Sequence, residues 1–284
     1  MVKLTAPKIR RFKAGPERPP LVMITAYDAP SARVAHDAGV DLILVGDSVA
    51  MVVLGYDDTL QVTVDDMVHH IAAVARVSPD PFIVGDLPWM SYHVSVEDTL
   101  RNAARLIRAG AQSVKLEGGR KRVPVIEALV AAEIPVMGHL GLTPQSMHAM
   151  GGFRVQGRSA EAAQELVDDA KACEAAGVFG IVLEGVPDVV AKMVTESIEV
   201  PTIGIGAGSN CDGQVLVFHD VVGLENRMNP KFVRRYAELL TDATSAVSAY
   251  ADDVRSGNFP SDDESYHLSG EVAEALSLYG SQLD

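Results

Sequence analysis

Eight short apolar runs, rich in Val, Ile and Leu, recur along the chain, and this repetition most constrains the fold. They cover residues 21–26, 41–48, 81–88, 113–118, 134–141, 178–185, 200–208 and 213–220. The runs are nearly continuous rather than strictly alternating, which is typical of strands buried on both faces. They therefore predict a parallel sheet covered by helices.

Helical patterns separate most of these runs. Residues 31–39, 94–110 and 159–177 repeat apolar positions every three to four residues, and each segment ends on a glycine, a common helix stop. The second segment also opens with an S-x-x-D cap signal at Ser95 and Asp98. Each predicted helix then leads into the next apolar run.

The alternation of strands and helices predicts a single-domain α/β fold, a (β/α)8 TIM barrel over residues 21–240, with a doubly wound sheet as the alternative. The gap between the seventh and eighth runs is too short for a full helix, so we expect that unit to be incomplete. Residues 1–20 form a basic N-terminal extension, and residues 241–284 an acidic, partly helical C-terminal segment.

The charge is strongly negative and unevenly placed. The chain has 38 acidic and 24 basic residues, a net charge of −14, which disfavours nucleic acid as a partner. Residues 1–20 carry +5, whereas residues 241–284 carry −8. Asp is abundant, at 22, and Lys is scarce, at 8. Such a surface is typical of proteins from a high-salt cytoplasm, where salt screens the repulsion between carboxylates, so we expect a halophilic enzyme.

The cysteines and the N-terminus indicate a cytoplasmic location. Cys173 and Cys211 are the only cysteines and form no C-x-x-C or zinc-type cluster, so a reduced compartment is expected. The basic N-terminus continues into Pro-rich polar sequence, unlike a signal peptide. No apolar run approaches the roughly 20 residues that cross a bilayer, so no membrane association is expected.

Polar side chains at the ends of the apolar runs mark the expected active site. In (β/α)8 barrels, active sites lie at the C-terminal ends of the strands. These ends carry almost the only polar side chains inside otherwise apolar strands, namely Asp47, Ser48, Asp86, Lys115, Glu117, His139 and Glu184.

The carboxylates of this group predict a metal site. Acidic side chains that converge on one barrel mouth repel one another unless a cation neutralises them. Oxygen ligands favour Mg2+, Mn2+ or Ca2+ over zinc. We expect Asp47, Asp86 and Glu117 to hold the metal and Glu184 to remain free. Lys115 is two residues before Glu117, so both side chains face the same pocket.

Some of these positions have simpler interpretations. A single strand-end Asp is more often a helix cap or turn former than a metal ligand. His139 could equally be a core histidine bonded to the backbone. The glycine-rich residues 204–208 resemble a phosphate-binding turn, but close backbone packing explains them as well.

Seven longer motifs resemble the ketopantoate hydroxymethyltransferase family, and the resemblance runs from about residue 20 to 236. They are VGDSVAMVVLGYDDTLQVTVDDM (45–67), DLPWMSY (86–92), VKLEGG (114–119), PVMGHLGLTPQS (135–146), GGFRVQGR (151–158), LEGVP (183–187) and PTIGIGAGSNCDGQVLVFHD (201–220). Their length and shared order make the resemblance more specific than any single short pattern.

The resemblance implies both an activity and an assembly. The family adds a hydroxymethyl group from 5,10-methylenetetrahydrofolate to 3-methyl-2-oxobutanoate, which gives 2-dehydropantoate on the way to pantothenate and coenzyme A. The reaction passes through a Mg2+-stabilised enolate on a (β/α)8 barrel. Family members are homo-oligomers, often decamers built from pentamers.

The resemblance also implies a role for each strand-end residue. It implies that Mg2+ is bound by Asp47, Asp86 and Glu117. It places the keto acid against Asp47, Ser48, Asp86, Lys115 and His139. It makes Glu184 the proton acceptor.

Two other functions fit parts of the sequence. The first is a Mg2+-dependent lyase or mutase of the phosphoenolpyruvate and isocitrate lyase type, which uses a similar barrel and a similar metal, but the catalytic Cys motif of those lyases is absent from this sequence. The second function is ligand binding or assembly by a barrel without catalytic activity. The intact carboxylates argue against it.

Overall fold

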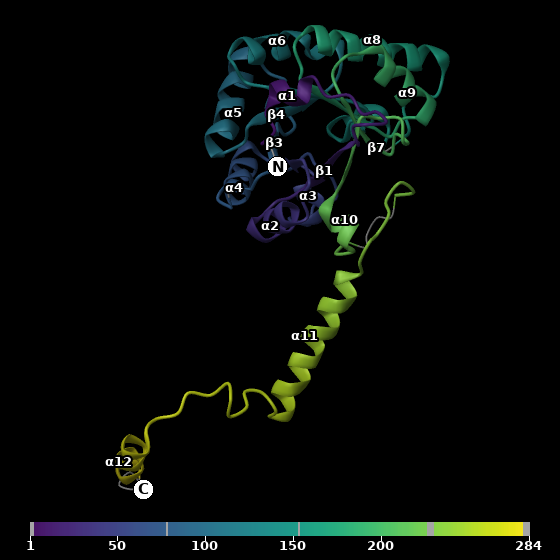
Figure 1. Ribbon diagram of the computed structural model, residues 1–284. Helices are drawn as coiled ribbons and strands as arrows, with labels where there is room; N and C mark the ends of the chain where they lie inside the picture. Colours follow the sequence, from purple (N-terminus) through teal and green to yellow (C-terminus); the bar gives the residue numbers. More distant parts are fainter. Residues whose placement is uncertain (1–2, 78, 153, 226–229, 281–284) are drawn as a thin grey trace. The chain divides into compact units, whose positions relative to one another are not determined.

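Eight parallel strands close into a barrel in sequence order, with the last strand paired to the first (Figure 1). The computed structural model describes residues 3–77, 79–152, 154–225 and 230–280. The strands are β1 (Leu21–Thr25), β2 (Leu42–Val45), β3 (Phe82–Asp86), β4 (Ser113–Glu117), β5 (Val136–Gly141), β6 (Gly180–Glu184), β7 (Thr202–Ile205) and β8 (Gly213–Leu216). The predicted (β/α)8 barrel is therefore confirmed, and the doubly wound sheet is not formed.

Helices follow most of the strands and surround the barrel. The longer ones are α2 (Ala29–Asp37), α4 (Val64–Ala75), α5 (Val96–Ala109), α6 (Val123–Ala131), α8 (Ala160–Ala175) and α9 (Asp188–Ser197). Short helical turns are α3 (Val49–Val52), η1 (Arg120–Arg122), η2 (Pro144–Ser146), α7 (Met147–Met150) and α10 (Phe218–Val222). The chain between β7 and β8 forms no helix, as the short gap there predicts.

The predicted helix ends match the structure closely. Ser95 caps α5 by accepting a hydrogen bond from the Asp98 backbone, and Gly110 ends this helix in the left-handed conformation. The helix predicted over residues 31–39 instead begins at Ala29, because the Asp28 side chain caps it.

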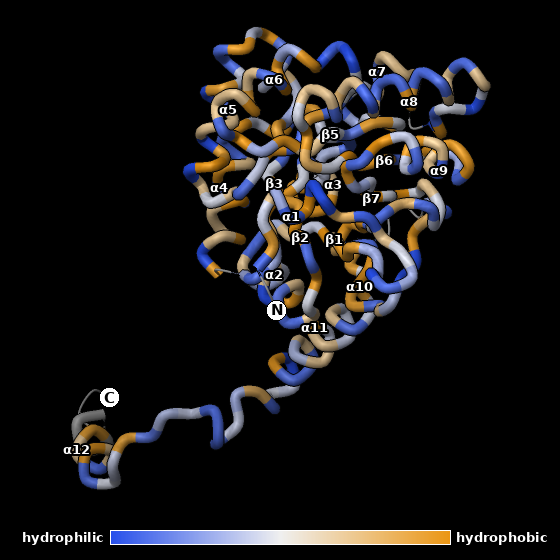
Figure 2. Tube along the Cα trace, turned by 45° about the horizontal axis from the view of Figure 1, so that its top comes forward, coloured by the Kyte–Doolittle hydropathy of each residue, from blue (hydrophilic) through white to orange (hydrophobic). Residues whose placement is uncertain are grey.

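Alternate residues of each strand pack into two separate clusters. Leu42 and Leu44 face an inner cluster inside the barrel, whereas Ile43 and Val45 face an outer cluster that includes residues of the surrounding helices. This period of two is the geometry of a strand. In Figure 2, hydrophobic and hydrophilic residues alternate along the helices that cover the barrel.

The basic N-terminal residues close one end of the barrel. Ile9, near the end of α1 (Ala6–Arg10), and Phe12 are buried in the inner cluster. Lys13 forms an ion pair with buried Asp212 at 2.9 Å, just before β8 begins. This is the end at which the strands start, so α1 leaves the opposite end open for a site.

The chain divides into two compact units, Met1–Tyr236 and Ala237–Asp284. The second unit contains α11 (Leu239–Ser256) and α12 (Gly270–Gly280), and α11 has no buried residue. Within this unit the rings of Tyr250 and Phe259 lie 5.4 Å apart. Among the helices of the described residues, none combines the length and apolar character needed to cross a bilayer.

Candidate active site

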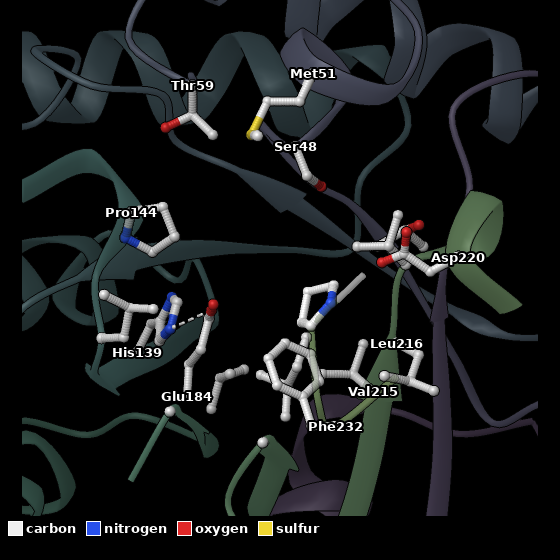
Figure 3. Close-up of a pocket in the computed structure, with 18 of the residues that line it drawn as sticks. Ser48, Met51, Thr59, His139, Pro144, Glu184, Val215, Leu216, Asp220 and Phe232 are labelled. Atoms are coloured by element: carbon white, nitrogen blue, oxygen red, sulfur yellow. Dashed lines mark ion pairs between the residues drawn. The ribbon is translucent and has the colours of Figure 1, made fainter. Parts of the chain in front are cut away.

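A cavity of about 920 Å3 opens at the C-terminal ends of the strands. All seven strand-end residues singled out in the sequence line it, namely Asp47, Ser48, Asp86, Lys115, Glu117, His139 and Glu184. Figure 3 shows the close-up of this cavity. The structure therefore brings together side chains that are up to 137 positions apart in the chain, from Asp47 to Glu184.

Strand periodicity explains why these side chains meet. Phe82 and Val84 of β3 point into the barrel, so Asp86, two residues further, does the same. In β4 and β5 the same period places Lys115, Glu117 and His139 inward. Only the last inward position or two of each strand lies above the apolar inner cluster, so these polar groups gather in one layer at the open end.

Lys115 lies at the centre of this layer. Its Nζ forms an ion pair with Asp86 Oδ1 at 3.0 Å and lies 3.2 Å from His139 Nδ1. Burial opposes the positive charge, but Asp86, Glu117 and Asp47 outweigh it, so the pKa of Lys115 is raised above its usual value. Lys115 is therefore a buried cation, suited to holding an anionic substrate.

His139 connects Lys115 to two carboxylates. Its Nε2 lies 3.2 Å from Glu184 Oε2, and its Nδ1 lies 3.5 Å from Glu117 Oε1. Burial and Lys115 oppose protonation, but Glu117 and Glu184 outweigh them and raise the pKa of His139 to about 9. In a neutral ring, Nδ1 accepts from Lys115 and the proton is therefore on Nε2. In a charged ring, both nitrogens carry a proton. In both forms the nitrogen nearest Glu184 carries a proton, so the ring attracts that carboxylate.

Three buried carboxylates lie close enough to repel one another. Burial and the charges of Asp86 and Glu117 raise the pKa of Asp47 well above its usual value. Asp86 Oδ1 and Glu117 Oε1 are buried and accept no hydrogen bond, although each lies in an ion pair, with Lys115 and His139 respectively. The described residues contain no preformed cluster of three His, Cys, Asp or Glu side chains arranged to hold a metal. The repulsion among three carboxylates nonetheless fits a Mg2+ ion that keeps several of its own waters.

Gln145 and Tyr92 hold the carboxylates in place, and the strand-end pattern does not identify them. Gln145 Nε2 donates to Asp47 Oδ2 at 2.8 Å, and the Gln145 backbone N–H donates to Glu117 Oε2 at 3.0 Å. The Tyr92 hydroxyl donates to Gln145 Oε1 at 2.6 Å. Each of these residues is at most 5% exposed. One uncharged residue therefore links two of the expected metal ligands, through its side chain and its backbone.

Tyr27 is a second residue that the strand-end pattern does not single out. Its hydroxyl lies 2.8 Å from Ser48 Oγ, and its ring is fully buried. Burial, opposed in part by the hydrogen bond to Ser48, raises the pKa of Tyr27, so the hydroxyl keeps its proton. The His70 ring nitrogen Nδ1 lies 2.7 Å from the Tyr27 carbonyl oxygen, so this histidine helps to hold the Tyr27 backbone.

Two glycines allow close backbone contacts at the cavity. Gly141, at the end of β5, has a φ of +89°, and a Cβ there would lie 2.3 Å from the Glu184 carbonyl oxygen. Gly206 has a φ of +60°, and a Cβ there would lie 2.7 Å from the Phe232 ring. The glycine-rich turn at 204–208 therefore permits close packing, one of its two sequence interpretations. Neither Cys173 nor Cys211 is among the described residues that line the cavity.

Known proteins match both the sequence and the fold. The family model described as "Ketopantoate hydroxymethyltransferase" matches residues 3–262. A 3-methyl-2-oxobutanoate hydroxymethyltransferase of Ignicoccus hospitalis is 55% identical over 261 residues, which cover 92% of this chain and 98% of that protein. A protein of the same name from Koribacter versatilis is 52% identical over 260 residues, 91% of this chain and 88% of that protein.

Solved structures of more distant proteins share the barrel. A structure of phosphonopyruvate hydrolase has a TM-score of 0.60 at 15% identity and covers 98% of this chain and 97% of its own. A structure of 2,3-dimethylmalate lyase, of the PEP mutase/isocitrate lyase superfamily, has a TM-score of 0.58 at 18% identity and covers 98% and 99%. At these identities the likeness supports the fold alone.

Proposed function

The chain belongs to the ketopantoate hydroxymethyltransferase family, and from this premise we propose that it transfers a hydroxymethyl group from 5,10-methylenetetrahydrofolate to 3-methyl-2-oxobutanoate. The product is 2-dehydropantoate, a precursor of pantothenate and coenzyme A. The relatives' shared name supports the keto acid as substrate. The observation that carries the mechanism is Glu184, held 3.2 Å from His139 on the wall of the cavity that also contains Lys115.

Binding of the keto acid would depend on the buried cation and on a hydroxyl. Lys115, charged and 3% exposed, would attract the substrate carboxylate. Ser48 would donate a hydrogen bond to the same substrate, with its hydroxyl held by Tyr27. The substrate would then lie within the layer of polar residues, between Lys115 and Glu184.

We propose that Mg2+ binds Asp47, Asp86 and Glu117, whose mutual repulsion it would relieve. When bound there, the ion would draw electron density from the keto group of the substrate and so make its C3–H more acidic. Gln145 would keep Asp47 and Glu117 in position, because its side chain bonds one and its backbone the other.

Proton transfer is assigned to Glu184. Its side chain is 16% exposed, so it reaches the cavity, and its Oε2 lies 3.2 Å from His139 Nε2. The carboxylate would remove the proton from C3, and Lys115 would stabilise the negative charge that develops on the keto oxygen. The C3 carbon would then attack the one-carbon unit of the folate, forming a C–C bond. Both C–N bonds that hold this unit would break, a water molecule would supply the hydroxyl oxygen, and the two folate nitrogens would take up one proton from C3 and one from the water, giving tetrahydrofolate.

The lyase or mutase alternative has less support. Its likeness to this chain is confined to the barrel fold, at 14–18% identity, whereas the hydroxymethyltransferases are about three times more similar in sequence. Neither cysteine lies at the cavity to serve as a lyase acid. These observations favour hydroxymethyl transfer.

The remaining expectations concern the cellular setting. We propose that the enzyme acts in the cytoplasm as a homo-oligomer, a decamer by family resemblance, and that it requires high salt. The supporting observations are the two free, buried cysteines and the net charge of −14.

An assay for 2-dehydropantoate tests the proposed function. Purified protein is incubated with 3-methyl-2-oxobutanoate and either methylenetetrahydrofolate or another reduced pterin carrier, after EDTA treatment and with or without added Mg2+. We expect product only with carrier and Mg2+ together. Full turnover in metal-free protein would refute the role of the metal. Cleavage of 2-methylisocitrate without hydroxymethyl transfer would instead establish the lyase.

A further inference from the structure

The cavity is larger than a five-carbon keto acid requires. Its volume of about 920 Å3 lies near the upper end of the roughly 300–1,000 Å3 typical of sites for drug-sized ligands. In Figure 3, His139 and Glu184 lie on one side of the cavity, Asp220 and Leu216 lie on the other, and the Phe232 ring lies between them. The second side therefore has room for a different ligand.

Apolar side chains make up much of the cavity lining. They include Met51, Val52, Val155, Leu216 and Phe232. Phe232 packs against the flat backbone of Gly206 and is still 40% exposed, so one part of its ring stays available. A partly exposed aromatic ring on an apolar wall favours a flat, ring-shaped ligand that can stack on it.

Asp220 is a partly buried acid among these lining residues. It lies in α10, lines the cavity and is partly buried, and Figure 3 shows its side chain beside Leu216. Among the described residues, no hydrogen bond or ion pair reaches its carboxylate. Burial, together with the charge of Glu225, raises its pKa, and the charge of Arg235 opposes this in part. A partly buried carboxylate that accepts no hydrogen bond gains from a ligand that supplies donors.

The charge of Asp220 indicates which ligand that is. The carboxylate repels the keto acid, whose own carboxylate is drawn to Lys115 on the far side of the polar layer. It would attract a neutral group with two N–H donors side by side, because its two oxygens can accept a parallel pair of hydrogen bonds. The edge of a 2-amino-4-oxopteridine, with its N3–H and 2-amino group, is such a pair.

We propose that Asp220 and Phe232 form the subsite for the pterin ring of the one-carbon carrier. Asp220 accepts hydrogen bonds from the ring N3–H and the 2-amino group, and Phe232 stacks on the ring face. This inference rests on the proposed function, since it assigns the second substrate of that reaction. It identifies the ring that is recognised and leaves the tail of the carrier free to vary.

The test compares two ligands that differ only at the edge that Asp220 is inferred to bind. Tetrahydrofolate and its 2-desamino analogue are titrated into wild-type protein and the Asp220→Asn variant by calorimetry, without keto acid. Asparagine keeps the size of the side chain but removes one acceptor and the charge. We expect tetrahydrofolate to bind the variant at least about tenfold more weakly, and the analogue to bind both proteins within about twofold.

A matched control separates this contact from general charge effects. Asp57 also lines the cavity but is exposed, so Asp57→Asn makes the same charge change without removing the proposed contact. Its tetrahydrofolate affinity should equal that of the wild type. Phe232→Leu, which keeps an apolar side chain but removes the ring, should weaken tetrahydrofolate and the analogue equally.

The possible outcomes separate the subsite from the reaction. Unchanged tetrahydrofolate binding in Asp220→Asn overturns the subsite, and so does an equal loss for both ligands in that variant. Deuterium exchange at C3 of the keto acid needs no carrier, so it should proceed at the wild-type rate in Asp220→Asn. If wild-type protein neither exchanges C3–H nor forms product, the proposed function fails, whatever the binding results show about the subsite.

Discussion

Replacing Gln145 by leucine should weaken metal binding without disturbing the fold. Leucine has a similar volume but no amide, so Asp47 Oδ2 loses its donor at 2.8 Å and the Leu87 carbonyl loses one at 3.0 Å. The Tyr92 hydroxyl also loses its acceptor at 2.6 Å. The backbone bond from residue 145 to Glu117 remains, because it does not involve the side chain. The substitution therefore frees one expected ligand, Asp47, and leaves the other in place.

The size of the effect follows from these bonds. A hydrogen bond to a charged group contributes about 1.5–3 kcal/mol, and partners that orient metal ligands change metal affinity by about 10- to 100-fold. Since about 1.4 kcal/mol corresponds to a factor of ten, the two figures agree. We expect Gln145→Leu to bind Mn2+, as a paramagnetic substitute for Mg2+, about 10- to 100-fold more weakly.

The assay is a Mn2+ titration followed by electron paramagnetic resonance, with thermal unfolding measured on the same samples. Gln112→Leu is the matched control, because Gln112 accepts a hydrogen bond from the Ile83 backbone at 3.0 Å and does not line the cavity. It should keep wild-type Mn2+ affinity. If Gln145→Leu remains folded and binds Mn2+ as tightly as the control, then Gln145 does not orient the metal ligands.

Three further predictions concern pH, backbone geometry and salt. Burial, Arg122 and Lys121 lower the pKa of His93 to about 4, so the unfolded chain binds more protons than the folded one between pH 6.5 and 4, and stability should fall across that window. His93→Asn should recover about 1 kcal/mol at pH 4, after discounting for the exposed part of the ring, and urea unfolding curves with unchanged pH dependence would contradict this. Gly141→Ala adds a Cβ 2.3 Å from the Glu184 carbonyl and should lower both the melting temperature and the rate of C3 exchange; wild-type values for both would show that the strand ends adapt. The melting temperature of the wild type should rise between low and molar KCl, because salt screens the net charge of −14, and an unchanged value would argue against a halophilic enzyme.

The polar residues at the strand ends predict the layer of polar side chains in the cavity, because strand periodicity and barrel closure act together. The period of two fixes which side chains face inward, and the parallel closure of the barrel places all the C-terminal ends at one mouth. Asp86, Lys115, Glu117, His139 and Glu184 can thus be placed together without knowing a single long-range contact. Their roles in binding and catalysis remain predictions.

Residues that act from outside the strands give no such signal. Gln145 lies in the 3-10 turn η2 and Tyr92 in the loop before α5, and their polar atoms meet only because the barrel brings β3, β4 and β5 together. The N-terminal segment also gives no local signal, since Lys13 and Asp212 form an ion pair although they are 199 positions apart in the sequence. Neither partner pair has a spacing that a local pattern can detect.

Asp220 could have been identified by the same rule that finds the other residues. It is the last residue of the eighth apolar run, residues 213–220. Asp86 likewise lies near the end of the third run, residues 81–88. In the structure, β8 ends earlier, at Leu216, and Asp220 lies in the helical turn that follows. In Figure 3 it lies across the cavity from Glu184.

Deuterium exchange at C3 of 3-methyl-2-oxobutanoate tests the role of Glu184 most directly. The substrate is incubated with Mg2+ in D2O, without a carrier, and exchange is followed by proton NMR. Wild-type protein should exchange the proton, and Glu184→Gln should exchange it about 100- to 10,000-fold more slowly while still binding the keto acid. Exchange at the wild-type rate in Glu184→Gln would show that another group removes the proton.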